Sequence, residues 1–399
     1  MEYDMVVAGA GPAGSIAAKY AALNGANVLL IEEHAAIGSP VECTGLLGTR
    51  AISECDLDPC NDFILNEISG TFVYSPSGQC FDIDGKSAKA YVVSRKALDK
   101  KLFSDAIDAG VDVSLRTKLV NIIWCNDHQE LIVLHNGIKK KIKTRMVIGA
   151  DGIKSKVAKI AGLGNVKEII SGIQIETPYR SKNSNFVEVF PGSVAPGFFA
   201  WTVPVNQNIS RIGLGVNGIE SPNALEYLRS FLNSNPNVIG RHGDSLLDVA
   251  IGGIPLGPLK RTVSDGVLVV GDAAGQVKPT SGGGIYPGAI CAKIAGKVAA
   301  DSVSDEDTSS DYLCQYEQKW RKKIGPELEM GMKLHELAEK FSDDDWNNLL
   351  RSMDNVHMKK MISQYGDIDK PSILVKEMLT LRNSFHLMGP LKSVIRAVL

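Results

Sequence analysis

Hydrophobic residues at the start of the chain form two short runs on either side of a glycine-rich turn. The first run, Met5–Ala8, leads into the turn at residues 9–14, and small helix-forming residues then continue to Gly25, which is placed to end a helix. The second run, Val28–Ile31, stops at Glu32. Short apolar runs beside turn residues predict buried strands, and the segment between them predicts a helix. The pattern therefore predicts a βαβ unit with two parallel strands.

The turn has the spacing Gly-x-Gly-x-x-Gly, formed by Gly9, Gly11 and Gly14. In such a turn Gly9 permits the tight bend, Gly11 lets the backbone approach a pyrophosphate, and Gly14 lets the helix pack closely on the sheet. The start of the helix offers free N–H groups and a positive dipole end to a diphosphate. Glu32 is placed to accept hydrogen bonds from an adenosine ribose. These features predict a dinucleotide site, and a glycine-rich turn without a ligand is the alternative.

Further along the chain, the hydrophobic period alternates between that of strands and that of helices. The predicted elements are a hairpin over 71–83, a helix over 97–109, several antiparallel strands over 111–148 ending with 146–148, mostly β-structure over 166–254 with one helix near 223–232, and a helix over 285–300. The chain beyond 305 is charged and predicted to be helical. A second Gly-x-Gly-x-x-Gly at 213–218 has no acidic strand end after it, so it predicts closely packed strand backbone rather than a second nucleotide site.

Composition narrows the classes of protein that fit. The 399 residues are 44% hydrophobic and 22% charged, which is enough apolar material for two or three domains, and the net charge of -2 gives no reason to expect nucleic acid as a partner. The seven cysteines form no Cys-x-x-Cys pair and the seven histidines do not cluster, so we expect neither a disulfide framework nor a metal site. We also expect no signal peptide and no transmembrane helix, and hence a cytoplasmic protein.

Two carboxylates far downstream follow apolar strands in the same way as the first turn. Asp151 lies in Gly-Ala-Asp-Gly, and Asp272 follows the buried run 266–271. Both are expected at the carboxyl edge of one parallel sheet, where ligands bind. For Asp151 we favour a helix cap, and for Asp272 we favour cofactor binding. Three glycines at 282–284 then enter a helix and would present N–H groups to an anion.

Together these segments resemble the FAD-dependent oxidoreductases of the p-hydroxybenzoate hydroxylase type. The resemblance implies FAD as the cofactor, with Asp272 on its ribityl chain and Arg95 near the flavin. Against the pyrimidine edge, the glycine turn would stabilise the negative charge that a flavin gains on reduction. The cofactor-binding residues that follow from the fingerprint and from this resemblance are Gly9, Gly11, Ala13, Gly14, Glu32, Glu33, Cys43, Thr44, Arg95, Val120, Asp272, Gly283, Gly284 and Ile285.

Two further segments are similar to the geranylgeranyl reductases within that group: 196–204, with its Phe-x-Trp-x-x-Pro pattern, and the loop 38–45. On a strand, Phe199 and Trp201 point to one face and would line an apolar tunnel for a polyprenyl chain, unless they are ordinary core residues. Cys43 is expected to contact the flavin, and a role as proton donor is left open against that of an inert buried cysteine. No catalytic residue is assigned beyond this candidate.

The resemblance implies an α/β fold with α+β elements, in which a Rossmann-like FAD-binding domain is interleaved with an antiparallel-sheet substrate domain. We assign residues 1–70, 90–165 and 260–303 to the first, residues 71–89 and 166–259 to the second, and residues 304–399 to a helical C-terminal region. The tail 376–399 is basic and apolar, and either contacts a membrane peripherally or docks on the body.

The similarity is greatest to archaeal digeranylgeranylglycerophospholipid reductases. It implies reduction of isolated C=C bonds in the geranylgeranyl chains of ether-lipid precursors, with an isoprenoid ether lipid as substrate. The electron donor is left open among reduced ferredoxin, F420H2 and NAD(P)H. A flavin monooxygenase of the same fold and a flavin electron-transfer protein are the alternatives.

Overall fold

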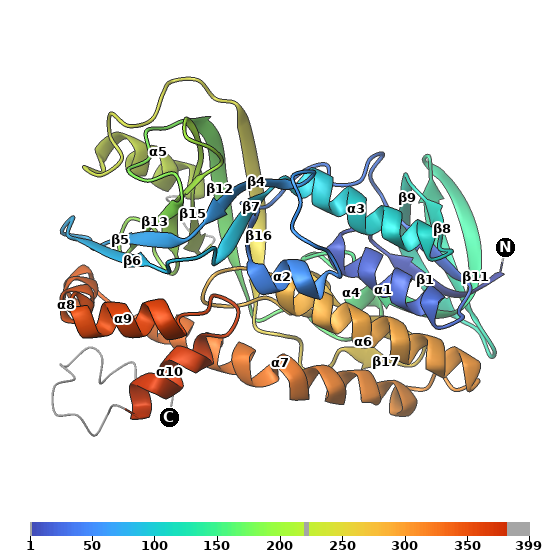
Figure 1. Cartoon of the computed structure of the whole chain (residues 1–399). Helices are drawn as coiled ribbons and strands as arrows, with labels where there is room; N and C mark the ends of the chain where they lie inside the picture. The colour runs from blue at the N-terminus through green and yellow to red at the C-terminus, as the bar shows by residue number, and fades with distance from the viewer. Residues whose placement is uncertain (1, 219–222, 381–399) are drawn as a thin grey trace.

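The computed structural model describes residues 2–218 and 223–380. Figure 1 shows two β-containing parts side by side, with the C-terminal helices lying beneath both of them. None of the helices in the described ranges is long and apolar enough to span a membrane.

The first part is built on an eight-stranded sheet. Its main path runs in the order β17 (Val263–Ser264), β18 (Val267–Val269), β11 (Ile138–Gly149), β1 (Glu2–Ala8), β2 (Val28–Ile31) and β8 (Asp112–Ser114), with β9 (Thr117–Trp124) and β10 (Gln129–His135) continuing from β11 as an antiparallel extension. The strands β18, β11, β1, β2 and β8 pair in parallel. The carboxyl ends of β1, β11 and β18 therefore meet at one edge of the sheet.

Helices cover this sheet. They are α1 (Pro12–Leu23), α2 (Thr49–Glu54), α3 (Arg95–Asp108), α4 (Lys156–Ile160) and α6 (Ile285–Ser304), and a 3-10 turn, η1 (Gly271–Ala274), follows β18. Helix α1 starts with Pro12. Proline lacks an N–H group, and this costs nothing in the first turn of a helix, where an N–H has no partner within the helix. The helix ends before Gly25, which has a φ of 90°. Helix α6 packs closely on α1, because a Cβ on Gly296 would meet the α1 backbone.

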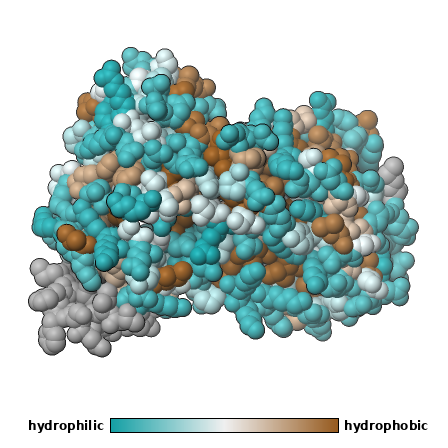
Figure 2. All heavy atoms as spheres, viewed as in Figure 1, coloured by the Kyte–Doolittle hydropathy of each residue, from teal (hydrophilic) through white to brown (hydrophobic). Residues whose placement is uncertain are grey.

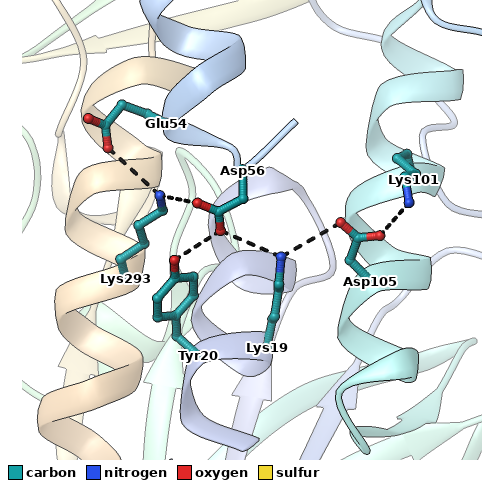
Figure 3. Close-up of polar contacts among 7 residues, drawn as sticks. All are labelled: Lys19, Tyr20, Glu54, Asp56, Lys101, Asp105 and Lys293. Atoms are coloured by element: carbon teal, nitrogen blue, oxygen red, sulfur yellow. Dashed lines mark hydrogen bonds and ion pairs between the residues drawn. The ribbon is translucent and has the colours of Figure 1, made fainter. Parts of the chain in front are cut away.

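A network of charged side chains joins four of these segments (Figure 3). Asp56, just after α2, pairs with Lys293 of α6 at 2.5 Å and with Lys19 of α1 at 3.5 Å, and it accepts a hydrogen bond from Tyr20 at 2.9 Å. Lys19 also pairs with Asp105 of α3 at 3.7 Å. The network thus connects α1, α3 and α6 with the segment after α2 through partly exposed side chains.

The second part is a seven-stranded sheet with α5 (Ala224–Ser234) on one face. Its order is β16 (Asp248–Leu256), β12 (Glu168–Pro178), β15 (Ile209–Asn217), β14 (Phe199–Pro204), β13 (Phe186–Pro191), β5 (Gly70–Tyr74) and β6 (Cys80–Asp84). All neighbours are antiparallel except β13 and β5, which pair in parallel. A three-stranded sheet is formed by β3 (Leu46–Gly48), β7 (Ala90–Val93) and β4 (Ile64–Ile68).

The C-terminal helices are α7 (Ser310–Ala338), α8 (Asp343–Met353), α9 (Val356–Tyr365) and α10 (Pro371–Thr380). Helix α7 packs into the core of the first part, since Tyr316 and Trp320 are both 0% exposed. Trp320 Nε1 donates to Thr262 Oγ1 at 3.0 Å, which ties the helix to the segment before β17. The proposed membrane or docking role of the tail falls largely on residues 381–399, outside the described residues.

Three predictions about these elements can be compared directly with the fold. The strand β8 pairs in parallel with β2, and residues 146–148 pair in parallel with β1 and β18, so the prediction of antiparallel strands over 111–148 is wrong for its first and last strands. The predicted last strand, 146–148, is the end of the longer β11, whose polar first half carries no continuous apolar signal. The second glycine pattern lies mainly in β15, as predicted. Its backbone is closely packed, because a Cβ on Gly213 would lie 2.8 Å from the Trp201 ring. The assigned domain boundaries stay a prediction.

Candidate functional site

Three turns that are far apart in sequence meet at the carboxyl edge of the parallel sheet. The Gly9 turn follows β1, Ala150 follows β11 and Asp272 follows β18. The N–H of Ala150 donates to the Ala8 carbonyl at 2.8 Å, and Val270 N–H donates to the Gly149 carbonyl at 2.9 Å. These bonds extend the parallel pairing past the strands and set the turns beside each other.

The glycines of the first turn have different surroundings. Gly9 has φ 102°, and a Cβ there or on Gly14 would collide with backbone atoms, of Ala150 and of Gly9 respectively. The predicted tight bend at Gly9 and the predicted close packing at Gly14 are confirmed. A Cβ on Gly11, in contrast, would meet nothing within 4 Å, so the backbone at this position faces open space. The approach of a pyrophosphate to Gly11 stays a prediction.

Asp272 lies at the first turn of η1 and faces the glycine turn before α6. A Cβ on Gly284 would lie 2.8 Å from its Oδ1. Burial raises the pKa of the Asp272 carboxyl above its ordinary value; Arg95 acts to lower it and Glu42 to raise it. Among the described residues, no group donates a hydrogen bond to this carboxylate. It is therefore free to accept hydrogen bonds from a ligand.

Asp151 has a structural role. Its carboxylate accepts hydrogen bonds from Ser155 Oγ at 2.6 Å and from the N–H groups of Lys156 and Val157 at 2.7 and 3.1 Å. Ser155 is the N-cap residue of α4, and Asp151 accepts from the next two N–H groups, which have no partner within the helix. The prediction that Asp151 caps the following helix is therefore confirmed for these donors, although Asp151 is not itself the N-cap residue.

A cavity of about 1390 Å³ begins at these turns and extends across the second sheet to α7 and α8. Its walls are mainly apolar, with few charged groups among the lining residues. The predicted site residues that line it are Gly11, Ala13, Cys43, Thr44, Arg95, Phe199, Trp201, Asp272, Gly283, Gly284 and Ile285.

Five predicted cofactor residues do not line this cavity: Gly9, Gly14, Glu32, Glu33 and Val120. Glu32 lies behind the first turn, where its Oε2 accepts from the Ala10 N–H at 2.9 Å. Glu33 forms an ion pair with Lys118, and this pairing lowers the pKa of Glu33. Val120 is half-buried in β9, the strand whose first N–H donates to the Glu32 carbonyl at 2.7 Å. The cofactor roles of Glu32, Glu33 and Val120 stay predictions.

The loop with Cys43 is held against the second sheet by two side chains. Gln174 Nε2 donates to the Cys43 carbonyl at 3.2 Å, and Arg211 donates to the Thr44 carbonyl at 2.7 Å. The Cys43 Sγ itself accepts from the Gly45 N–H at 3.3 Å. Arg95, the first residue of α3, is fixed by a two-pronged contact with Asp99 at 3.0 and 3.1 Å.

The strand β14 contributes an aromatic wall. Phe199 and Trp201 lie on one face of the strand with ring centroids 5.9 Å apart, and Phe198 stacks on Phe199 at 4.3 Å. Neighbouring glycines leave room for these rings, because a Cβ would lie 2.8 Å from Trp201 at Gly213 and 2.9 Å from Phe198 at Gly215. The predicted common face is confirmed, whereas contact with a substrate stays a prediction.

Sequence reasoning missed the contribution of the C-terminal helices to this cavity. Leu334, His335, Leu337, Ala338, Glu339, Phe341 and Trp346 line it. No local motif marks these residues, because they reach the cavity only through the packing of α7 and α8. Among the described residues, one cluster of side chains could hold a metal ion: atoms of Glu168, His335 and Glu339 that can bind a metal lie within 4.8 Å of one another. Within this cluster, His335 Nε2 lies 3.1 Å from Glu168 Oε1. The prediction that no metal is bound stays a prediction.

The residues at the sheet edge fit FAD. The open space at Gly11 suits a diphosphate, and the Asp272 carboxylate has free acceptor positions for ribityl hydroxyls. The hydroxyl of Ser281 is buried beside the glycine turn and has no hydrogen-bond partner among the described residues. A buried hydroxyl without a partner is costly, and a ligand group in the cavity would supply one.

Fold and site together define an FAD-dependent oxidoreductase. Residues 4–167 match the family model of FAD dependent oxidoreductases, and residues 168–254 match that of the geranylgeranyl reductase catalytic domain. The digeranylgeranylglycerophospholipid reductase of Methanocaldococcus jannaschii is 37% identical over 382 residues, which cover 93% of this chain and 96% of that protein. Digeranylgeranylglycerophospholipid reductase 2 of Methanopyrus kandleri is 33% identical, covering 91% of this chain and 93% of its own length. The chain belongs to the geranylgeranyl reductase family.

Solved structures agree with this assignment. A geranylgeranyl bacteriochlorophyll reductase-like protein from Thermoplasma acidophilum has a TM-score of 0.83 at 27% identity, covering 95% of this chain and 99% of that chain. The flavin-dependent halogenase CmlS, at 15% identity, has a TM-score of 0.69 over 96% of this chain and 78% of its own, and shares the fold alone. The predicted α/β fold, the FAD cofactor and the enzyme class are thereby confirmed.

Proposed function

We propose that this enzyme reduces isolated C=C bonds in the geranylgeranyl chains of archaeal ether-lipid precursors, as a digeranylgeranylglycerophospholipid reductase. One observation carries the proposal: a single, largely apolar cavity connects Asp272 and the glycine turn with Phe199 and Trp201. A polyprenyl chain offers no charge to bind, so its site must be shaped by apolar and aromatic walls. The names of the relatives support the same substrate class.

Different residues of the cavity have different roles in this reaction. The aromatic wall and the side chains of α7 and α8 exclude water and hold the chain against the sheet edge. Bound in its reduced form, FAD supplies the hydride. Asp272 and the turn 282–284 would hold the cofactor, and Arg95 lines the same cavity and acts electrostatically on Asp272. Cys43, a lining thiol on the neighbouring loop, is the candidate to hold the proton that the second alkene carbon receives.

Peripheral contact with a membrane is part of the same proposal, because the substrate is a lipid. The edge strand β16 and the residues before it expose large apolar side chains: Leu246 (58%), Leu247 (52%), Val249 (44%) and Ile251 (66%). The intervening residues Ala250, Gly252 and Ile254 line the cavity. The face shown in Figure 2 is mainly hydrophilic, with hydrophobic residues scattered over it. This strand thus supports a short path from lipid to cavity.

The decisive experiment incubates the FAD-loaded protein, reduced with dithionite, with digeranylgeranylglyceryl phosphate under argon. The product is weighed by mass spectrometry. The proposal expects a mass gain of one H2 for each reduced bond, with one reduced flavin oxidised for each bond. Unchanged lipid in the presence of bound, fully reducible flavin would contradict it.

Oxygen uptake that depends on NAD(P)H and is coupled to an oxygenated product would select a monooxygenase instead. Trials with reduced ferredoxin, F420H2 and NAD(P)H identify the donor.

A further inference from the structure

A buried ion pair connects the glycine turn with the C-terminal helices. Lys278 Nζ lies 2.5 Å from Asp369 Oδ1 and donates to the Ile368 carbonyl at 3.1 Å. The side chains of Lys278 and Asp369 are only 11% and 1% exposed. Removing two charges from water is costly unless they pair closely, so the loss of one leaves the other buried without compensation. The two residues therefore act as one electrostatic unit.

Lys278 touches the glycine turn through both its backbone and its side chain. Its N–H donates to the Gly283 carbonyl at 3.2 Å, and its carbonyl accepts from the Gly282 N–H at 2.8 Å. A Cβ on Gly283 would lie 2.7 Å from Lys278 Cε and 3.1 Å from Nζ. A positive charge thus lies directly against the turn, and both Lys278 and Gly283 line the cavity.

Asp369 is fixed from the other side. Its N–H donates to Asp367 Oδ1 at 2.8 Å, and Asp367 in turn accepts from Arg50 Nε at 2.8 Å. A Cβ on Gly48 would collide with the Asp369 carboxylate, so the segment also packs closely on the end of β3. The carboxylate that balances Lys278 therefore comes from the loop between α9 and α10, far from the turn in sequence.

We propose that Lys278 and Asp369 together set the reduction potential of the bound flavin, with the C-terminal region supplying the balancing charge. The proposal rests on the placement of the flavin pyrimidine edge against the turn 282–284. A positive charge at this edge stabilises the negative charge that the ring gains on reduction, and the carboxylate opposes it. Because both charges are shielded from water, each acts over several ångströms with little screening.

The test measures the midpoint potential of the bound flavin by dye-coupled reduction in three variants. Lys278→Met leaves Asp369 alone and is expected to lower the potential, whereas Asp369→Asn leaves Lys278 alone and is expected to raise it. The double variant Lys278→Met/Asp369→Asn is expected to return close to the wild-type value. Each single shift is expected to change the ratio of affinities for reduced and oxidised flavin about tenfold, which is about 30 mV for a two-electron couple.

Two further variants separate this role from a structural one. Lys278→Arg keeps the charge and is expected to keep the potential, and Arg50→Met breaks the neighbouring ion pair of the same loop without touching the turn. Shifts of the two single variants in the same direction, or a lower unfolding temperature with no change in potential, overturn the proposal. The measurement needs no lipid, so opposite shifts would stand even if the wild-type enzyme failed to reduce geranylgeranyl chains.

Discussion

The side chain of Gln174 donates through Nε2 to the backbone carbonyl of Cys43 at 3.2 Å, although 131 residues separate the two. Through Oε1 the same amide accepts from Trp201 Nε1 at 3.4 Å. One side chain of β12 thus connects the loop on one side of the cavity with the aromatic wall on the other. The position of Cys43 depends on the second sheet as well as on its own loop.

Replacing Gln174 by Leu removes both bonds at nearly constant volume. We expect the Cys43 loop to loosen and FAD to bind about fivefold more weakly, since a hydrogen bond of this kind contributes about 1 kcal/mol. Fluorescence titration of the apoprotein with FAD measures the change. Gln364→Leu, at an exposed position of α9, is the matched control and is expected to bind FAD normally. Unchanged affinity in Gln174→Leu would show that the loop is held by other contacts.

The aromatic wall is expected to govern the binding of long chains. Truncation of Trp201 to Ala removes apolar contact area of a kind that contributes about 1.5–3 kcal/mol, so kcat/KM for a geranylgeranyl lipid is expected to fall at least about tenfold. The flavin spectrum and FAD affinity are expected to stay unchanged. Trp124→Ala, on the distant strand β9, serves as the control. Equal losses in both variants would assign Trp201 to the core instead of the substrate site.

The buried charge of Asp272 is expected to lower the stability of the apoprotein and to raise its affinity for FAD. Asp272→Asn removes a buried charge and is expected to stabilise the apoprotein at neutral pH on the order of 1 kcal/mol, while weakening FAD about tenfold or more. Because the folded-state pKa of Asp272 is raised, its protonated form stabilises the fold at low pH, and this contribution is lost as the pH rises through that pKa. The difference in Tm between variant and wild type should therefore be larger at pH 8 than at pH 5. A constant difference would argue against burial as the cause.

The exposed apolar side chains of β16 are expected to contribute to membrane contact. The double variant Val249→Ser/Ile251→Ser is expected to cosediment several-fold less with vesicles of ether lipid than the wild type, because it loses apolar area that would enter the interface. Leu225→Ser, on the exposed side of α5, is the control for a general change in surface hydropathy. Reduction of detergent-solubilised substrate should be unaffected. Equal sedimentation of both variants would place the contact elsewhere.

The sequence predicts the nucleotide half of the site well because its determinants are local. The roles of Gly9, Gly14 and Asp151 follow from turn and cap geometry, which depends on a few neighbouring residues. The Phe199 and Trp201 face follows from the period of a single strand in the same way. These features need no knowledge of how distant segments pack.

The rest of the site depends on tertiary packing that no local pattern encodes. His335 and Phe341 reach the cavity only because the C-terminal helices lie beneath both β-containing parts. The pairing of Lys278 with Asp369 spans 91 residues and joins two loops. The parallel pairing of β8 was missed for a similar reason: a strand of three residues carries no pattern that distinguishes parallel from antiparallel pairing.

The alternation along β16 restricts how this enzyme can vary. Ala250 and Ile254 line the cavity while Ile251, between them, faces outward. Inserting or deleting a single residue at the start of the strand would exchange the two sets, turning the side chains of Val249 and Ile251 into the cavity and that of Ala250 toward solvent. Homologues adapted to other lipids should therefore differ here by substitution at constant length, with changes in length confined to the connections on either side of the strand.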